Sequence, residues 1–455
     1  MLAFMIGGDR SGCGKTSITL ALGALLAENH KVQTFKAGMD YIDPSYLTAA
    51  TGRPCRNLDS FVMDAAQIRA IFAHACKGAD IAIVEGVRGL YEGADAISDT
   101  GSSASIAKIL GIPVVLVVNA ASITRSAAAI VRGFASFDPD VAIRAVILNN
   151  VMGKRHAEKA VGAIEHFCEI PVIGTIPRSD EMVLTMRHLG LVPFLEGQGS
   201  GEFRKRIEGI TGRIREHVSV GRLLSAASAT PLPPDPRLFA GRETDVTVAV
   251  AQDEAFNFYY SDLFDLLPAL GAGVVTFSPV HDRLPETDGI IIGGGYPELF
   301  LGQLEGNDPM REALAEVSRN GVPIYGECGG LMYLTDRIVL GKGWQGEPDE
   351  QSGEMCGVFS GETRMPARRV VSYVEGSCTG GPLGEGCFRG HEFHYSDVRL
   401  AGDTRYVYRL TRGVGISDSL DGAVVNETLG SYTHLHPVSS REMFSHFVER
   451  CRKNR

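Results

Sequence analysis

Short apolar runs that alternate with helix-like segments restrict the fold of this chain more than any other feature of its sequence. In the first half, residues 3–6, 81–85 and 114–118 are nearly continuous apolar runs of strand length. Segments with helical patterns, such as 65–75 and 103–110, lie between runs of this kind. Strands that are apolar on both faces and alternate with helices predict an α/β fold with a doubly wound, mostly parallel sheet.

A segment rich in proline and small residues, 225–236, interrupts this rhythm near the middle of the chain. Its composition (Ser-Ala-Ala-Ser-Ala-Thr-Pro-Leu-Pro-Pro-Asp-Pro) is typical of an extended linker, and strand-like runs resume after it. A chain of 455 residues has room for more than one domain. We therefore predict an N-terminal domain over 1–224, a linker over 225–244 and a second α/β domain over 245–455.

Charge and composition argue against several classes of protein. The formal net charge is −10, whereas nucleic-acid binders usually carry a basic face. No apolar run approaches the ~20 residues needed to cross a bilayer, and the first residues lack the pattern of a signal peptide. The nine cysteines show no paired spacing, which indicates reduced thiols. We expect a cytoplasmic protein that acts on a small molecule and binds neither nucleic acid nor membrane; a homodimer is compatible with these features.

Residues 11–16 read Ser-Gly-Cys-Gly-Lys-Thr and stand between a predicted strand and a predicted helix. Glycine-rich loops in this setting bind phosphate because successive backbone N–H groups point at the anion and the helix adds its positive end. Asp9 stands where the standard pattern has glycine, so the alternative is a glycine turn with an incidental lysine. The setting favours an ATP site, with Lys15 at the β- and γ-phosphates and Thr16 on Mg²⁺. The predicted nucleotide-binding residues are Ser11, Gly12, Cys13, Gly14, Lys15 and Thr16.

Carboxylates follow two further predicted strands of the first half. Asp40 and Asp43 come after one strand. Glu85 ends the other, and Glu92 lies seven residues beyond it. Open α/β sheets place ligand groups at the carboxyl ends of their strands, and Mg²⁺ prefers oxygen ligands. We predict that Asp40 and Glu85 bind Mg²⁺ together with Thr16. The alternative for each acid, which weighs most for Asp43 and Glu92, is a helix cap or a solvated loop charge.

Cys328 lies in Tyr-Gly-Glu-Cys-Gly-Gly-Leu, directly after the apolar residues 322–324. This pattern predicts a strand, a sharp glycine-flanked turn and a helix, an elbow that lifts a nucleophile out of a sheet. A helix N-terminus after the thiol favours its thiolate form. The alternative is a buried structural cysteine. The glycines at 293–295 follow another predicted strand, and their N–H groups are candidates for an oxyanion hole.

A thiol nucleophile needs a base, and two histidine clusters are candidates. His434 lies in the strand-like stretch 431–435, and His436 follows it directly. Strand alternation places both histidines on one face. Either is therefore a candidate base for Cys328. His391 and His394 form a second cluster, for which structural hydrogen bonding is an equal alternative. No spacing among these histidines matches a zinc site.

These motifs occur together in a known family. The chain resembles the cobyrinic acid a,c-diamide synthases, including the closely similar Ni-sirohydrochlorin a,c-diamide synthases of methanogenic archaea, over nearly its full length. By this resemblance, the N-terminal half looks like a dethiobiotin-synthetase-like ATP domain. The C-terminal half looks like a class I glutamine amidotransferase with a Cys–His pair and no third acidic partner. The stretches that carry the resemblance are 11–16, 35–44, 48–53, 57–60, 85–93, 255–260, 293–299, 325–334, 390–396 and 434–436.

The resemblance implies a ligase that uses ATP, Mg²⁺ and glutamine to amidate the a and c acetate side chains of a modified tetrapyrrole. Cys328 would release ammonia from glutamine through a thioester, with His434 as base and His436 as the second choice. The substrate carboxylate would become an acyl phosphate, with Lys15 offsetting the developing charge. The residues expected at the macrocycle are Asp40, Tyr41, Asp43, Arg88, Glu92, His391 and His394.

Three departures from the family pattern bear on which macrocycle is used. Arg88 stands where many members have Met, Glu92 stands where they have Asp, and residues 369–376 differ from the version usual in cobyrinate enzymes. They favour the nickel-tetrapyrrole branch, because a guanidinium pairs well with the carboxylates of a macrocycle. The choice between Ni-sirohydrochlorin and cobyrinate stays open.

Three other functions are alternatives. The first is a P-loop ATPase of partition or metallochaperone type whose second domain is degenerate, and the intact cysteine elbow argues against it. The second is a tetrapyrrole-binding regulatory protein without turnover, which requires both sites to be broken. The third is an enzyme like cobyric acid synthase that amidates other side chains; the stretches 40–44 and 391–394 fit the a,c-diamide branch better.

Overall fold

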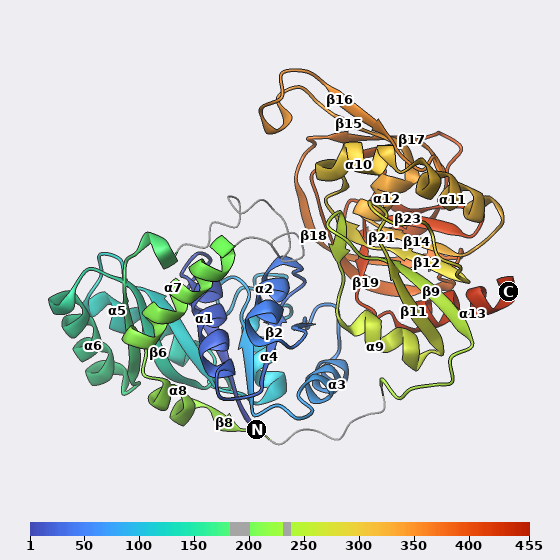
Figure 1. Cartoon of the computed structure of the whole chain (residues 1–455). Coiled ribbons are helices and arrows are strands. Elements are labelled where there is room, and N and C mark those ends of the chain that lie inside the picture. Colours follow the sequence, from blue (N-terminus) through green and yellow to red (C-terminus); the bar gives the residue numbers. More distant parts are fainter. Residues whose placement is uncertain (183–200, 231–237) are drawn as a thin grey trace. The chain divides into compact units, whose positions relative to one another are not determined.

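The computed structural model describes residues 1–182, 201–230 and 238–455, and the side chains of 201–204 are not described. The chain divides into two compact units, Met1–Pro236 and Arg237–Arg455 (Figure 1). Each unit is an α/β structure with its own sheet, which confirms the predicted fold class.

The first unit is built on a parallel sheet whose strands run in the order β3-β2-β4-β1-β5-β6-β7. The strands are β1 (Leu2–Gly8), β2 (Val32–Ala37), β3 (Arg56–Leu58), β4 (Ile81–Glu85), β5 (Val114–Asn119), β6 (Ile143–Val151) and β7 (Val172–Pro177). The helices are α1 (Lys15–Ala27), α2 (Ile42–Thr51), α3 (Ala65–Ala75), α4 (Ser103–Leu110), α5 (Arg125–Phe137), α6 (Lys154–Cys168), α7 (Gly201–His217) and α8 (Val220–Ala226). Buried apolar side chains of α1 and α7 pack on alternate residues of the central strands and form the core of one face.

Local capping fixes where some of these helices begin. Asp64 accepts a hydrogen bond from the backbone of Gln67, whose side chain accepts one from the Asp64 N–H, so α3 starts with a capping box. The side chain of Ser102 caps α4 by accepting a hydrogen bond from the Ser105 N–H. The sequence predicts both helices with the observed bounds because the caps and the apolar pattern agree.

The first residues of the predicted linker are structured. The sequence predicts an extended segment from residue 225, but α8 continues to Ala226, and β8 (Ser228–Ala229) pairs antiparallel with Leu2 and Ala3 of β1. The small residues of this stretch fit beside the first residues of the central strand β1, where their backbone groups find partners. The remaining prolines lie at 231–236, outside the described residues.

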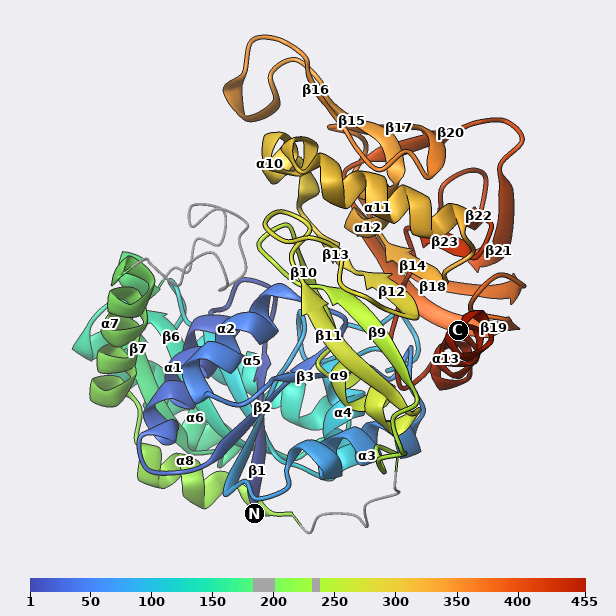
Figure 2. The same ribbon diagram turned by 45° about the vertical axis from the view of Figure 1, so that its right-hand side comes forward.

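The second unit has a larger sheet with a parallel and an antiparallel half (Figure 2). The strand order is β11-β9-β12-β14-β23-β22-β21-β18-β19-β24; pairing is parallel from β11 to β23 and antiparallel from β23 onward. In chain order the strands are β9 (Val246–Ala251), β11 (Ala272–Phe277), β12 (Gly289–Ile292), β14 (Ile324–Glu327), β18 (Val370–Thr379), β19 (Glu385–His394), β21 (Arg405–Arg412), β22 (Leu420–Val425), β23 (Thr428–Ser431) and β24 (His434–Leu435).

Two smaller sheets and five helices complete this unit. The pair β10 (Phe256–Phe258) and β13 (Gly294–Gly295) lies beside the parallel half, and β15 (Thr335–Leu340), β16 (Gln351–Glu354), β17 (Phe359–Met365) and β20 (Asp397–Leu400) form a four-stranded sheet. The helices are α9 (Asp262–Ala269), α10 (Leu301–Gly306), α11 (Asp308–Arg319), α12 (Gly329–Leu334) and α13 (Arg441–Asn454). One apolar cluster joins α9 and α13 to the main sheet, and another joins α11 and α12 to it.

Candidate active sites

Cys328 lies at the turn between β14 and α12, where the sequence predicts the elbow. Its backbone has φ 48° and ψ −97°, a conformation that residues other than glycine rarely adopt. The Cys328 N–H donates a hydrogen bond of 2.7 Å to the Ser431 carbonyl, which holds the turn against β23. A Cβ at Gly330 would overlap the carbonyl oxygen of Ile292, so only glycine lets α12 begin this close to the sheet.

The thiol of Cys328 is hydrogen-bonded to His434, which β24 delivers from the far end of the chain. The Nδ1 atom of His434 lies 3.3 Å from Oε2 of Glu327, so Nε2 is the ring nitrogen left for the thiol. Burial opposes the charged form of His434, but Cys328 and Glu327 outweigh burial and raise the pKa of His434 to about 10. The imidazole is therefore held as an imidazolium next to the thiol at neutral pH.

Asp421 fixes the segment that carries His434. Its two carboxylate oxygens accept hydrogen bonds from the N–H groups of Tyr432 and Thr433, at 3.0 and 2.9 Å, and from the Thr433 hydroxyl at 2.7 Å. The predicted continuous strand over 431–435 is therefore wrong: β23 ends at Ser431, and β24 begins anew at His434. The bend, rather than strand alternation, aims His434 at the thiol.

His436 follows β24, and its contacts are with residues other than Cys328. Its Nδ1 accepts a hydrogen bond of 3.3 Å from the Val438 N–H, and its Nε2 lies 3.5 Å from Oδ2 of Asp262. Its ring packs on Tyr260 with 4.7 Å between the ring centroids. These contacts direct His436 toward Tyr260 and Asp262, and among the described contacts it is His434 that is hydrogen-bonded to the thiol.

His391 and His394 are both buried in the second unit. His391 pairs with His434 across β19 and β24, and the two rings stack with 5.0 Å between centroids. Burial lowers the pKa of His391 well below its ordinary value and that of His394 to about 4, so both are neutral at neutral pH. His394 stacks on Tyr432, and its Nδ1 lies 3.0 Å from the Ser396 carbonyl. His391 and His394 are therefore buried side chains that surround the Cys328–His434 pair.

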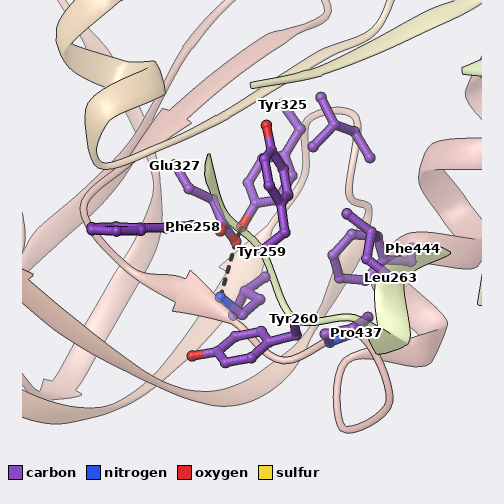
Figure 3. A pocket seen from close by; sticks show the side chains of 10 residues that line it. Phe258, Tyr259, Tyr260, Leu263, Tyr325, Glu327, Pro437 and Phe444 are labelled. Atoms are coloured by element: carbon purple, nitrogen blue, oxygen red, sulfur yellow. Dashed lines mark hydrogen bonds between the residues drawn. The ribbon is translucent and has the colours of Figure 1, made fainter. Parts of the chain in front are cut away.

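Glu327 is a site residue that sequence reasoning missed. Its Oε1 accepts hydrogen bonds from the Tyr325 hydroxyl at 2.5 Å and from the Leu435 N–H at 3.0 Å, while Oε2 faces His434. Figure 3 shows it beside Tyr325 in a small pocket lined mainly by aromatic and aliphatic side chains, including Phe258 and Phe444. The expectation of a Cys–His pair without an acidic neighbour is therefore wrong. Its position directly before Cys328 was the only signal in the sequence.

The loop at residues 11–16 connects β1 to α1, as the sequence predicts. Gly12 and Gly14 both have positive φ, 75° and 99°. A Cβ at Gly14 would overlap the side-chain amide of Asn149, which donates a hydrogen bond of 2.9 Å to the Cys13 carbonyl. Lys15 is buried, and its amine donates to the carbonyl oxygens of Arg10, at 3.3 Å, and Arg88. Ser11 is exposed at the outer end of the loop.

A buried charged cluster lies beside this loop. The Thr16 hydroxyl donates hydrogen bonds to Glu85, at 2.7 Å, and to Asp43, at 3.4 Å. Lys36 forms ion pairs of 2.5 Å with Asp43 and 2.7 Å with Glu85. Burial raises the pKa of Glu85 to about 7, with Lys36 opposing the shift; burial lowers the pKa of Lys36, but Asp43 and Glu85 raise it above its ordinary value. The cluster therefore keeps a lysine charge to balance its carboxylates.

Asp40 lies just before α2, next to the charged cluster. Its Oδ1 accepts hydrogen bonds from the N–H groups of Ile42, at 2.8 Å, and Asp43, at 3.1 Å, so it caps the start of α2. Asp43, rather than Asp40, is hydrogen-bonded to Thr16. Burial, followed by the charge of Asp43, raises the pKa of Asp40 to about 6. The contacts of Oδ1 are those of a helix cap, and α2 is a helix that the sequence did not predict; a role of Asp40 at the metal stays a prediction.

The cluster can accommodate a divalent cation only in part through protein ligands. Within the described residues, no three histidine, cysteine, aspartate or glutamate side chains are grouped to hold a metal ion. Asp43 Oδ1 and Glu85 Oε2 are buried, and neither has a hydrogen-bond partner among the described residues. Two such oxygens beside a threonine hydroxyl fit Mg²⁺, which binds one or two carboxylates and takes its other ligands from phosphates and water.

Three further residues expected at the macrocycle belong to the first unit. Arg88 and Glu92 are exposed, and Tyr41 is half-buried just before α2. Arg88 has a positive φ of 49°, and its carbonyl is a partner of Lys15. Asp43 and Arg88 therefore contact the loop, through Thr16 and Lys15, whereas His391 and His394 belong to the second unit.

Comparison with known families assigns each unit a class. Residues 4–190 match the CobQ/CobB/MinD/ParA nucleotide-binding domain, and residues 247–442 match the CobB/CobQ-like glutamine amidotransferase domain. The elbow and the phosphate loop described above lie within these two matches. Together they define a glutamine-dependent, amide-forming ligase that carries its own nucleotide-binding unit.

The chain belongs to the cobyrinate a,c-diamide synthase family. It is 50% identical to the cobyrinate a,c-diamide synthase of Methanosarcina acetivorans over 99% of this chain and 95% of that protein. It is 48% identical to that of Methanosarcina barkeri, over 99% and 96%, and 44% identical to that of Methanothermobacter thermautotrophicus, over 98% of each chain. None of the helices in the described parts of the chain has the length and apolar content needed to span a membrane.

Proposed function

We propose that this protein uses ATP and glutamine to convert the a and c acetate side chains of cobyrinate to amides. The observation that carries the proposal is the hydrogen-bonded Cys328–His434 pair on a chain that also holds a phosphate loop. The names of full-length relatives that are 44–50% identical support cobyrinate as the substrate. The proposal assigns amide synthesis to residues 1–224 and glutamine hydrolysis to residues 245–455.

In the second unit, the thiolate of Cys328 attacks the carboxamide carbon of glutamine. The C–S bond forms as the C–N bond breaks, and the imidazolium of His434 gives its proton to the departing ammonia. Water then attacks the thioester and gives a proton to His434, and the C–S bond breaks to release glutamate. The raised pKa of His434 suits this role because the proton is available at neutral pH.

In the first unit, the phosphates of ATP bind the loop from Ser11 to Thr16, with Lys15 next to the γ-phosphate. A substrate carboxylate attacks that phosphate, and ammonia then displaces phosphate from the acyl phosphate. Thr16, Asp43 and Glu85 would hold Mg²⁺, which supplies charge to orient and neutralise the phosphates. Asp40 shapes this site through α2.

We infer that Arg88, Tyr41 and Glu92 contact the macrocycle. The Arg88 carbonyl is a partner of Lys15, Tyr41 lies two residues before Asp43, and Glu92 follows Arg88 on the segment after β4. A guanidinium at position 88 pairs with the carboxylates that such a substrate carries. For His391 and His394 we infer support of the thiol site in place of substrate contact, because both are buried beside it. The net charge of −10 supports an enzyme without a nucleic-acid partner, and we propose that it works in the cytoplasm.

The proposal is tested by assaying the purified chain with cobyrinate and with Ni-sirohydrochlorin side by side. We expect amide formation on cobyrinate that requires both ATP and glutamine. Cys328→Ala should lose glutamine use and keep activity with added ammonium salt, because ammonia then bypasses the second unit. Amidation of Ni-sirohydrochlorin alone would overturn the assignment of cobyrinate as the substrate. Glutamine use by Cys328→Ala would overturn the assignment of Cys328 as the nucleophile. ATP hydrolysis without glutamine turnover would favour the ATPase alternative.

A further inference from the structure

Glu327 bridges the side chain of one residue and the backbone of the next. One oxygen, Oε2, lies 3.3 Å from Nδ1 of His434, and the other, Oε1, accepts the Leu435 N–H at 3.0 Å. A carboxylate that contacts both groups fixes the imidazole relative to the strand that carries it. The residue directly before the nucleophile therefore holds the ring that serves the nucleophile.

The carboxylate is itself held in place. Tyr325 and Glu327 are two residues apart on β14 and so lie on the same face of the strand. The Tyr325 hydroxyl donates to Oε1, which already accepts the Leu435 N–H, and this leaves Oε2 for the imidazole. Glu327 is only 7% exposed, so water competes little for either oxygen.

We propose that Glu327 is a positioning residue that orients His434 and keeps it protonated toward Cys328. An acceptor at Nδ1 fixes the ring tautomer so that Nε2 faces the thiol, and its negative charge stabilises the imidazolium. Glu327 then supplies what the third, acidic member of a catalytic triad supplies, but from the position next to the nucleophile in the chain. Two other buried acids of the region are bonded elsewhere: Asp421 to backbone and hydroxyl groups of Tyr432 and Thr433, and Glu392 to the N–H groups of Val414 and Gly415.

This inference rests on the proposed glutamine hydrolysis at Cys328 and is tested on the full chain with Glu327→Gln. The amide keeps the size of the side chain and removes its charge. We expect kcat/KM for glutamine hydrolysis to fall by about 10²- to 10⁴-fold, as when the acid of a triad becomes an amide. Amidation with added ammonia should stay within about threefold of the unmodified protein, because the first unit is unchanged. Glu312→Gln, on the exposed side of α11, is the matched control.

A pH profile separates positioning from a merely structural role. Without the carboxylate, the imidazolium of His434 should lose its proton at lower pH. The alkaline limb, which is the high-pH change in the rate of Cys328 alkylation by iodoacetamide, should therefore move down by about one to three pH units. Alkylation is followed by mass spectrometry on the peptide that contains Cys328, since Cys387 is exposed and reacts as well. Tyr325→Phe, which removes one anchor and keeps the charge, should leave this limb near its original position.

The outcomes are distinguishable. If the unmodified chain hydrolyses glutamine and Glu327→Gln does so with unchanged kcat/KM, the positioning role is wrong. It is also wrong if activity falls while the alkylation profile keeps its alkaline limb, because that result indicates loss of structure alone. If the unmodified chain does not hydrolyse glutamine at all, the proposed function fails first.

Discussion

Cys328 combines a strained backbone with a charged neighbour. Its φ of 48° costs conformational free energy of order 1–3 kcal/mol, which the hydrogen bond to Ser431 and the packing of α12 must offset. The strain lifts the thiol out of the sheet toward His434. Strain at a nucleophile is thus a consequence of where the side chain must point.

The raised pKa of His434 predicts an alkaline limit to glutamine hydrolysis. Because the pKa of His434 in the folded chain is about 10, above its ordinary value of 6.5, the ion pair stabilises the fold fully below about pH 6.5. That stabilisation is lost as the pH rises through about 10. We expect the rate of glutamine hydrolysis to fall over the same upper range, because the proton for the departing ammonia is then missing.

Initial rates measured with saturating glutamine from neutral to strongly alkaline pH would check this limit. His394 does not contribute to a change of rate in that range, because its pKa is about 4. A rate that already falls near the ordinary pKa of histidine would contradict the raised pKa of His434.

The proposal that Asp43 binds Mg²⁺ in place of Asp40 leads to a second prediction at the residue scale. Asp43→Asn should raise the Mg²⁺ concentration for half-maximal ATP-dependent amidation by at least about tenfold, because it removes a ligand charge. Asp40→Asn should change it by less than about threefold, because asparagine caps a helix about as well as aspartate. Mg²⁺ titrations of the two variants provide the measurement, and the reverse order of effects would restore Asp40 as the ligand.

At the scale of elements, the elbow depends on close packing between α12 and the sheet. Gly330→Ala should destabilise the second unit by about 1–3 kcal/mol, because its Cβ would overlap the Ile292 carbonyl, which cannot move without moving β12. Thermal unfolding of the full chain measures the loss. Gly302→Ala, in α10, is the control, since no atom lies within 4 Å of the added Cβ. Equal midpoints for both variants would contradict the close packing.

The sequence predicts the parallel strands well and other elements poorly, for a physical reason. Strands buried on both faces are continuous apolar runs, so β4 has the predicted bounds. Strands such as β18 and β21 are half-exposed and polar, and their pairing partners are distant in the chain. The start of α2 depends on Asp40, whose Oδ1 accepts two backbone N–H groups, and the sequence alone did not indicate this helix.

The same contrast applies to the site residues. Cys328 and the loop to Thr16 are predicted because their chemistry is local in sequence. The choice between His434 and His436 depends on Asp421, whose carboxylate bends the strand from a distant position, and no local pattern reports that contact.

At the scale of the whole molecule, each unit has its own apolar core, so the two reactions should be separable by mutation. Lys15→Ala should reduce ATP-dependent amidation by at least about 10²-fold, because it removes charge stabilisation of the transferring phosphate. Glutamine hydrolysis should remain within about threefold, since the two sites belong to separate compact units. Lys31→Ala, at an exposed position, is the control. Parallel loss of both activities would show that the units depend on each other.

The pairing of β8 with β1 means that the first unit closes on itself. Its last described strand lies beside its first, with Ala229 opposite Leu2 and the Thr230 N–H donating to the Met1 carbonyl at 3.0 Å. The last described residues of this unit therefore lie beside its first residues. A different protein could be fused after residue 230, and every strand of the sheet would keep its position.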